Sequence, residues 1–348
     1  MDDAGTWWED EGLMGGLIEG YFNSLFSTSH PSDFDDILSG IQPAISNEMN
    51  DILTREFIAD EIQHALKQMA PTTAPGPDGK SPIFYKTFWN IVGNDVIKIV
   101  LDALNKGCVH ESLNETFITL IPKVKNPKNV SNFRPISLCN VVYKLISKVV
   151  VNRSKKILPN IVSDSQSAFL PGRLITDNVL VAFETLHYLK CKTQGKDGYM
   201  ALKLDMSKAY NRVEWTFLKK VMRHLGFAES IVKLIMSCMS SVTYVVLLNG
   251  QPVGNIKPSR GLRQGDLLSP YLFLLCALGL QSLLHKAEVN GEINGVAICR
   301  NGPRISHLFF ADDSVVFCRV REEECQKIID LLSIYERGSG QKINRDKN

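Results

Sequence analysis

The sequence of 348 residues predicts an α+β fold on three observations. Many segments place apolar residues at helical spacing. Several shorter runs are rich in β-branched residues and end at turn residues, which is typical of strands. Between two such runs, Asn249 and Gly250 give a strong β-hairpin signal. Length alone suggests about two domains.

The helical segments are the most extensive feature of the sequence. The predicted helices cover about residues 12–27, 54–69, 83–104, 141–157, 174–190, 214–224, 228–240, 269–289 and 321–337. Residues 28–52 are mixed and acidic, which predicts a loop with short helical pieces. We interpret the apolar face of the first helix as ordinary packing.

The predicted strands are short apolar runs with turn signals at their ends. They cover about residues 116–121, 199–206, 242–248, 293–299 and 304–310. After the last of these, Asp312 and Asp313 interrupt two apolar runs and predict a β-hairpin with carboxylates at its tip. Aspartate is common in turns, so the pair alone does not indicate a site.

A third carboxylate changes the interpretation of that hairpin. Asp205 ends the predicted strand 199–206 and lies beside the acidic pair if these strands join one sheet. Three carboxylates together repel one another unless a cation neutralises them. A pair of Mg²⁺ ions would do so and would support phosphoryl or nucleotidyl transfer, activating a hydroxyl and stabilising a leaving pyrophosphate.

The charges are unevenly distributed, although the formal net charge is only +2. Residues 1–61 contain fourteen acidic residues and one basic residue, whereas residues 123–156 contain nine basic residues and no acidic one. Such a segment predicts a positive surface that contacts phosphates, with a merely solvated surface as the alternative.

The cysteines and the apolar runs indicate in which cellular compartment the protein resides. The eight cysteines are scattered without a Cys-x-x-Cys pair, which predicts free thiols in a reducing compartment. The N-terminus lacks the basic region of a signal peptide. The most apolar stretch, Tyr271 to Leu280, has about half the length of a membrane span. We expect a soluble intracellular protein without a membrane partner.

Two connectors rich in glycine and proline interrupt the helices. Residues 70–80 predict a short, shaped loop between helices rather than a flexible tether. Residues 259–270 combine two glycines and two arginines around Gln264, and glycines there let the backbone approach a ligand closely.

Seven short motifs follow one another along the chain: Ala74–Gly79, Leu120–Lys123, Asn132–Ser137, Ala168–Arg173, Lys203–Tyr210, Arg260–Gly265 and Phe310–Asp313. In these motifs and in their order the chain resembles reverse transcriptases of non-LTR retrotransposons. Seven ordered motifs are far more specific than any one of them. The chain resembles most closely the reverse transcriptase domain of plant LINE-type polyproteins, of which it would be a fragment.

The resemblance implies a right-hand polymerase with fingers and palm, the thumb missing. The palm would be an antiparallel sheet with helices packed on one side. By this comparison residues 1–70 form an N-terminal helical extension, 71–198 the fingers-like region with the start of the palm, and 199–348 the palm. The reverse transcriptase domain would cover about 104–348.

The resemblance also assigns residue roles. It implies that Asp205, Asp312 and Asp313 are catalytic and bind two Mg²⁺ ions, or Mn²⁺, with the backbone carbonyl of Met206. Tyr210 matches the steric gate that favours deoxynucleotides. The implied nucleotide-binding residues are Lys123, Arg134, Tyr210, Gln264 and Lys342. The implied loop against template and nucleotide contains Arg260, Gly261, Arg263 and Gly265.

The leading hypothesis is therefore an RNA-directed DNA polymerase that uses an RNA template, a DNA primer and dNTPs in retrotransposition. Asn211 and Leu267 depart from the residues usual in the family, so a decayed remnant that only binds nucleic acid is the alternative. RNA-templated RNA synthesis is a third hypothesis. A nuclear location follows from the resemblance alone.

Overall fold

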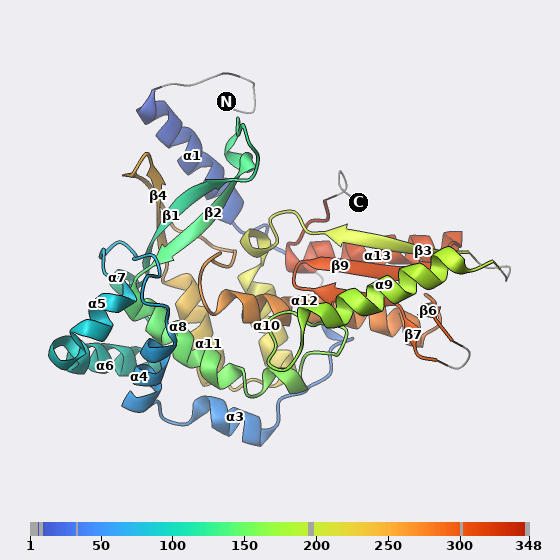
Figure 1. The fold of residues 1–348 in the computed structure, drawn as a ribbon, viewed down its shortest axis with the longest axis horizontal. Helices are drawn as coiled ribbons and strands as arrows, with labels where there is room; N and C mark the ends of the chain where they lie inside the picture. Colours follow the sequence, from blue (N-terminus) through green and yellow to red (C-terminus); the bar gives the residue numbers. More distant parts are fainter. Residues whose placement is uncertain (1–5, 7–9, 33, 194–197, 300–301, 345–348) are drawn as a thin grey trace. The chain divides into compact units, whose positions relative to one another are not determined.

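The computed structural model describes residues 6, 10–32, 34–193, 198–299 and 302–344. Contacts divide the chain into two compact units (Figure 1). The first unit contains residues 1–28, 47–154 and 228–269, and the second contains 29–46, 155–227 and 270–348. Each unit combines segments that are distant in the sequence; residues 228–269, for example, join residues 47–154.

The first unit contains a four-stranded sheet in the order β2-β1-β4-β5. Its strands are β1 (Glu115–Pro122), β2 (Phe133–Cys139), β4 (Thr243–Leu248) and β5 (Gln251–Ile256). β1 pairs antiparallel with β2 and parallel with β4. The predicted turn at Asn249 and Gly250 is confirmed, with φ angles of 51° and 82° that suit a tight hairpin. The parallel pairing brings β4 and β5 back to strands more than 100 residues earlier.

Helix α1 (Glu11–Phe26) packs on this sheet. The Asp10 carboxylate caps it by accepting a hydrogen bond of 2.8 Å from the Leu13 backbone N–H. Its buried face shares a core cluster with the strands, formed by Ile18, Phe22, Leu25, Phe26, Ile118, Val242, Tyr244, Val246 and Ile256. The packing interpretation of this helix is confirmed.

Helix α8 (Val141–Ser154) is buried along most of its length, and the remaining helices of the first unit pack against it or against one another. They are α3 (Asn47–Thr54), α4 (Ala59–Gln68), α5 (Pro82–Thr87), α6 (Trp89–Lys106), α7 (Glu111–Asn114) and α11 (Glu229–Ser240). The predicted helix 83–104 is broken at Phe88, whose φ of −104° and ψ of 21° end α5 and cap α6.

The predicted helix 54–69 begins later than expected, at Ala59. The Arg153 guanidinium donates hydrogen bonds to the backbone carbonyls of Leu53, Arg55 and Glu56. Those carbonyls are therefore occupied by a side chain from α8. This contact separates α3 from α4.

The second unit contains an antiparallel sheet in the order β3-β9-β8. Its strands are β3 (Tyr199–Asp205), β8 (His307–Phe310) and β9 (Asp313–Arg319). The predicted strands 293–299 and 304–310 are interrupted, since the chain also forms the short pair β6 (Val296–Ala297) and β7 (Arg304–Ile305).

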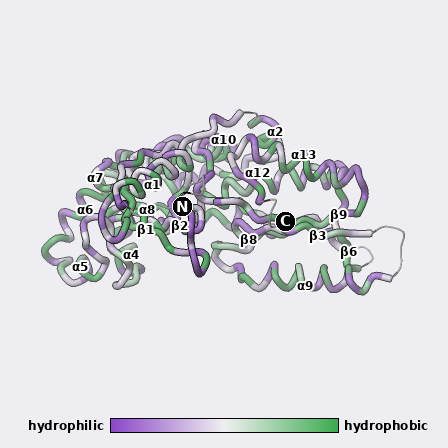
Figure 2. The backbone as a smooth tube through the Cα atoms, turned by 90° about the horizontal axis from the view of Figure 1, so that it is seen from above, coloured by the Kyte–Doolittle hydropathy of each residue, from purple (hydrophilic) through white to green (hydrophobic). Residues whose placement is uncertain are grey.

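Helices cover both faces of this sheet, so the prediction of helices on one side is wrong. Helix α9 (Ile175–Cys191) packs on β8, and α13 (Glu322–Ser339) packs on β9. Figures 1 and 2 show α9 on the opposite face of the sheet from α13 and α12 (Ser269–Val289). The reason is that β9 buries consecutive residues from Val316 to Cys318 and therefore has apolar side chains on both faces. Helices α2 (Phe34–Leu38) and α10 (Trp215–Leu225) complete this unit.

Within the described residues, α12 alone is long and apolar enough to cross a membrane. However, 61% of its most apolar window is buried inside the protein. Core helices of soluble proteins share this length and composition.

Candidate functional site

The pairing of β3 with β9 places Asp205 directly opposite Asp313. Residues directly opposite in an antiparallel pair project from the same face. Lys203, two residues before Asp205, shares that face, and its Nζ lies 3.4 Å from Asp313 Oδ1. The expected meeting of the Asp205 strand with the acidic hairpin is confirmed.

The third carboxylate lies in the turn of the same hairpin. Phe310 pairs with Asp313, which leaves Ala311 and Asp312 as a two-residue connection between β8 and β9. Ala311 has a φ of 53°, in the left-handed region that residues other than glycine adopt at a cost. Asp312 is half-buried, whereas the Asp313 side chain is 57% exposed.

Tyr210 is held beside this turn. It begins the short 3-10 helix η3 (Tyr210–Arg212), and its ring stacks on Phe273 of α12 with centroids 5.0 Å apart and planes 8° apart. Burial, together with the negative charge of Asp312, raises the pKa of the Tyr210 phenol. The phenol is therefore neutral, rigidly placed and within electrostatic range of Asp312.

A segment near residue 344 supplies contacts to Asp205 that the sequence did not reveal. The Asn344 backbone N–H donates to the Asp205 carbonyl at 2.8 Å, and its side-chain Nδ2 donates to Asp205 Oδ2 at 3.3 Å. Met206 forms an isolated antiparallel bridge with Ile343. From the sequence, only Lys342 of this segment was a candidate. The side-chain amide of Asn344, two residues after Lys342, is the sequence feature that could have indicated a contact with a carboxylate.

Lys342 lies on the same segment, whose backbone borders the end of β3. Its carbonyl accepts a hydrogen bond of 2.7 Å from the Ser207 N–H. Its Nζ lies 4.0 Å from Glu336 Oε2, and its side chain is 54% exposed. The segment thus places an exposed lysine next to the strand that carries Asp205.

The carboxylate oxygens are of the type that Mg²⁺ binds. In this structure, however, no group of three acidic, histidine or cysteine side chains among the described residues converges closely enough to bind a metal ion. Asp313 contacts Lys203 and Asp205 contacts Asn344. An exposed ion pair is worth at most about 1 kcal/mol, so rotating Asp313 toward Asp205 requires little free energy. The residue types suit divalent ions, and the side chains would have to rotate to hold them.

The basic segment lies mostly in the first unit and is only partly exposed. Lys123, Lys125, Lys128 and Arg134 are exposed on and between β1 and β2. Lys144 and Arg153 are buried, in contrast to the predicted positive surface. Lys144 Nζ donates to the Ala74 carbonyl at 2.7 Å. These two cations hold neighbouring segments of the unit together.

Arg153 illustrates the structural use of a buried cation. Its guanidinium forms a salt bridge of 2.7 Å with Glu61 and lies 3.5 Å from the Phe57 ring centroid. Burial raises the pKa of Glu61, but the hydrogen bond and charge of Arg153 outweigh it, so the net shift is downward. This pair joins α8 to α4.

The loop around Gln264 is anchored to β2. The Ser137 N–H donates to the Gln264 carbonyl at 2.8 Å. Gly265 has a φ of 115°, and a Cβ there would lie 2.8 Å from the Ser137 carbonyl oxygen. Glycine is therefore required by both backbone conformation and space. The Gln264 side chain is half-buried.

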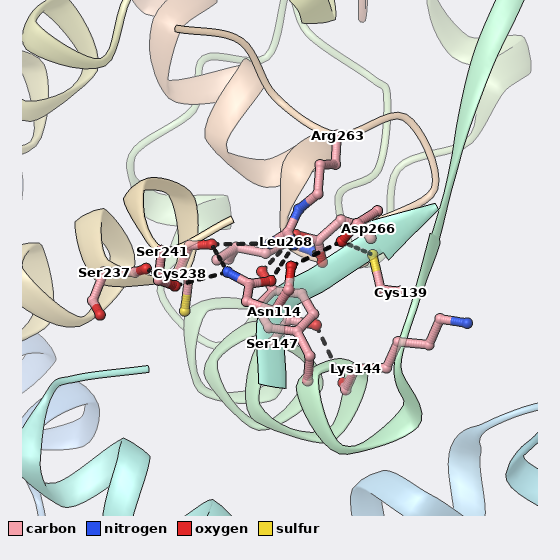
Figure 3. A network of polar contacts seen from close by, with 12 residues as sticks. Asn114, Cys139, Lys144, Ser147, Ser237, Cys238, Ser241, Arg263, Asp266 and Leu268 are labelled. Atoms are coloured by element: carbon pink, nitrogen blue, oxygen red, sulfur yellow. Dashed lines mark hydrogen bonds and ion pairs between the residues drawn. The ribbon is translucent and has the colours of Figure 1, made fainter. Parts of the chain in front are cut away.

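The two arginines of this loop, Arg260 and Arg263, are buried. Arg260 Nε donates to the Leu25 carbonyl at 2.9 Å. Arg263 Nη2 donates to Asp266 Oδ2 and to the Cys238 carbonyl, both at 3.0 Å, and Nη1 donates to Asn114 Oδ1 (Figure 3). Both side chains of the Arg263–Asp266 pair are 4% exposed. The buried pair therefore anchors the loop to the interior of the first unit.

Aromatic contacts complete this network. The Tyr143 hydroxyl donates to Asp266 Oδ2 at 2.7 Å, and the Arg263 guanidinium lies 3.9 Å from the Tyr143 ring centroid. Burial alone would lower the pKa of Arg263, but the neighbouring Tyr143 and Asp266 raise it above its ordinary value. Arg263 therefore stays charged in the interior.

A hollow of about 590 Å³ lies elsewhere in the second unit, and the sequence did not predict it. Its lining includes His285, Glu288, Ser306 and His307. Ser306 Oγ donates to Glu288 Oε2 at 2.7 Å and lies 2.9 Å from His307 Nδ1. Burial, followed by the charge of His285, lowers the pKa of His307 to about 4. His307 is neutral at physiological pH.

An antiparallel sheet with two opposed aspartates and a third in the adjoining turn is the arrangement expected of a metal-dependent nucleotidyltransferase. Residues 121–348 match the family described as "Reverse transcriptase (RNA-dependent DNA polymerase)". The chain belongs to this family, whose members are RNA-directed DNA polymerases.

Several curated proteins are similar to this chain. The uncharacterized 149 kDa protein of transposon TX1 from Xenopus laevis is 27% identical over 99% of this chain and 26% of its own length. The Pol polyprotein of the type-2 retrotransposable element R2DM from Drosophila melanogaster is 25% identical over 88% of this chain and 28% of its own length. An uncharacterized mitochondrial protein of Arabidopsis thaliana is 53% identical over 68 residues, 20% of this chain and 56% of that protein. The chain thus spans about a quarter of the two transposon proteins.

Proposed function

We propose that this chain adds deoxynucleotides to the 3′-OH of a DNA primer on an RNA template, as part of the retrotransposition of a non-LTR element. The observation that carries the proposal is Asp205 opposite Asp313, with Asp312 in the adjoining turn, in a member of the reverse transcriptase family. The seven ordered motifs suggest a LINE-type element, and the similarity of 68 residues to an Arabidopsis protein hints at a plant origin.

Two Mg²⁺ ions, or Mn²⁺, would be held by Asp205, Asp312, Asp313 and the backbone carbonyl of Met206. Bound divalent ions supply activation of a hydroxyl and neutralisation of a leaving pyrophosphate. The protein contributes these oxygens from the end of β3, the start of β9 and the turn before β9. Before a metal ion binds, Lys203 partly neutralises the charge of Asp313.

Nucleotide contacts are proposed for five residues. Lys123, Arg134 and Gln264 would bind the incoming triphosphate and base, and Lys342 would lie near the leaving phosphate. Tyr210 would exclude a ribose 2′-hydroxyl, because its ring is stacked on Phe273 and cannot swing aside without breaking that stacking. Replacing Tyr210 by alanine is therefore expected to reduce the preference for dNTP over rNTP.

Primer extension tests the proposal directly. Purified chain is incubated with an RNA template annealed to a DNA primer, dNTPs and Mg²⁺ or Mn²⁺. We expect extension by the wild-type chain and by Asp330→Asn, an exposed position on α13, but a loss of at least about a hundredfold in Asp312→Asn. A folded wild-type chain that binds the duplex but never extends it would contradict the proposal. Preference for rNTP would instead indicate RNA synthesis.

A remnant that only binds nucleic acid is the second candidate, and the exposed cations around β1 and β2 favour it. In that case the chain would bind RNA–DNA duplex with strong salt dependence and no synthesis. Action in the nucleus is proposed from the family alone, and imaging of a tagged full-length protein tests it.

A further inference from the structure

The acidic hairpin is supported along its outer edge by residues 165–168. The Phe309 N–H donates to the Ser165 carbonyl at 2.8 Å, and the Ser167 N–H donates to the Phe309 carbonyl at 3.4 Å. Gln166 and Phe309 form an isolated parallel bridge. This short segment therefore continues the sheet beyond β8.

The side chain of Gln166 connects this segment to the turn. It is 2% exposed, and its Oε1 accepts hydrogen bonds from the Ala168 N–H at 2.9 Å and from the Ala311 N–H at 3.2 Å. Ala311 is the residue with the left-handed conformation, and Asp312 follows it directly. A costly backbone conformation persists where neighbouring contacts hold it. Gln166 supplies such a contact.

Gln166 is itself held in place by two other side chains. The Arg173 guanidinium donates to the Gln166 carbonyl at 2.7 Å and to the Val162 carbonyl at 2.8 Å. Asn178 Nδ2 donates to the Ser165 carbonyl at 2.7 Å and to the Phe309 carbonyl at 2.8 Å. The segment and β8 therefore cannot separate without breaking several buried hydrogen bonds.

Packing alone does not explain a glutamine at this position. Gln166 Nε2 is buried and has no hydrogen-bond partner among the described residues. A buried amide donor without an acceptor is unfavourable, so an apolar side chain of the same length would serve packing better. The contact of Oε1 with the Ala311 N–H offsets this cost.

We propose that Gln166 is a positioning residue that fixes Ala311 and thereby sets the place of Asp312. The catalytic consequence rests on the proposed function, whereas the effect on the turn does not. Gln166→Met removes the acceptor and keeps the length of the side chain. Gln166→Glu keeps an oxygen acceptor in either protonation state. Gln326→Met, at an exposed position of α13, is the matched control.

Hydrogen exchange measured by mass spectrometry tests the effect on the turn without requiring activity. We expect the amides of residues 307–313 to exchange about tenfold faster in Gln166→Met, as follows from losing one or two neutral hydrogen bonds. Exchange in Gln166→Glu and Gln326→Met should stay within about threefold of wild type. Unchanged exchange in Gln166→Met, or rapid exchange of the Ala311 amide in the wild-type chain, overturns the proposal.

A second substitution tests the route through Ala311. Glycine adopts a positive φ without steric cost, so Ala311→Gly should reduce the dependence of the turn on Gln166. The double variant should therefore exchange more slowly than the product of the two single effects predicts. Multiplicative effects would exclude the proposed route. If Gln166→Met fails to fold, the exchange rate of the Ala311 amide in the wild-type chain still decides, because rapid exchange there overturns the proposal.

Kinetics test the catalytic consequence separately. We expect kcat for primer extension to fall about tenfold or more in Gln166→Met, with KM for dNTP within about threefold of wild type, because Asp312 rather than a nucleotide-binding group is displaced. An equal loss in Gln326→Met would overturn the assignment. Absence of extension by the wild-type chain refutes the proposed function, whereas the exchange experiment still decides the positioning role.

Discussion

The buried pair of Arg263 and Asp266 offers the sharpest test of how the glycine-rich loop is held. Replacing Arg263 by methionine keeps the aliphatic bulk and removes hydrogen bonds to Asn114, to the Cys238 carbonyl and to Asp266. Breaking a buried ion pair by removing one partner typically costs about 3–5 kcal/mol, because the remaining charge is uncompensated. The structure allows a narrower expectation for each partner.

After Arg263→Met, Asp266 keeps the hydrogen bond from the Tyr143 hydroxyl at 2.7 Å and that from the Leu268 N–H at 3.2 Å. We therefore expect a loss of about 3 kcal/mol, at the lower end of the range. Asp266→Asn leaves the guanidinium charged and buried without a counter-ion, which predicts about 4 kcal/mol. The double variant removes both charges, so its cost should fall below the sum by about 2 kcal/mol or more.

Urea denaturation followed by circular dichroism measures these free energies of unfolding, and hydrogen exchange in α8 and α11 localises the loss to the first unit. The control is Lys106→Met, which breaks an exposed pair of 2.6 Å between Lys106 and Asp102 on α6. Its cost should be below about 0.5 kcal/mol. Two results would contradict this expectation. One is a loss of unfolding free energy in Arg263→Met no larger than that in Lys106→Met. The other is a loss in the double variant equal to the sum of the two single losses.

Three further predictions concern other regions. The pKa of His307 is lowered from 6.5 to about 4, so on acidification the unfolded state takes up the proton first. The free energy of unfolding should therefore fall between about pH 6.5 and pH 4 by up to about 3 kcal/mol. Denaturation midpoints measured over this pH range, with His307→Gln for comparison, test the expectation. Replacing Lys125 and Lys128 by glutamine should reduce the slope of log binding constant against log salt by about 0.7–0.9 for each phosphate that is no longer neutralised, in fluorescence anisotropy with an RNA–DNA duplex. Arg153→Met should destabilise the first unit by about 3 kcal/mol and speed hydrogen exchange in residues 53–61, since Glu61 loses its buried partner.

The strand pairing at the site was predictable from the sequence because it depends on local signals. Apolar runs around Asp312 and Asp313 gave the hairpin, and Asp205 ended another buried run. Strand and turn propensities act over a few residues, so they survive in the sequence. The same holds for the turn at Asn249 and Gly250 and for most of the helices.

The features that the sequence did not predict depend on distant contacts. The start of α4 is shifted by Arg153, a side chain about a hundred residues away in the chain. Helices cover both faces of the β3-β9-β8 sheet because α9 packs on β8, a strand more than 100 residues later in the chain. Periodicity shows that a strand is apolar on both faces but does not show which helix covers each face.

The sequence also did not show whether the Arg263 side chain is buried or exposed. In the loop around Gln264, the sequence does not show which way the Arg263 side chain points, and in the structure it pairs with Asp266 in the interior. An acidic residue three positions later was a signal for such a pair, but the same spacing occurs on exposed loops. Burial of a cation requires a complete set of acceptors, and Asn114 and the Cys238 carbonyl come from α7 and α11.

The buried polar groups bear on whether the chain is an active domain or a decayed remnant. Arg263 with Asp266 and Arg153 with Glu61 are charge pairs in which loss of either partner alone costs several kcal/mol, on the order of 3–5. Substitutions that accumulate without selection strike one partner at a time and leave the other uncompensated. Both pairs are intact, as are the three aspartates and the contact of Gln166 with the turn. Asn211, the departure nearest to Tyr210, is buried, and its backbone N–H donates to the Lys208 carbonyl at 2.9 Å. The intact pairs preserve the fold, which both a polymerase and a nucleic-acid-binding remnant require, and the three aspartates preserve the carboxylates that the proposed polymerase would use.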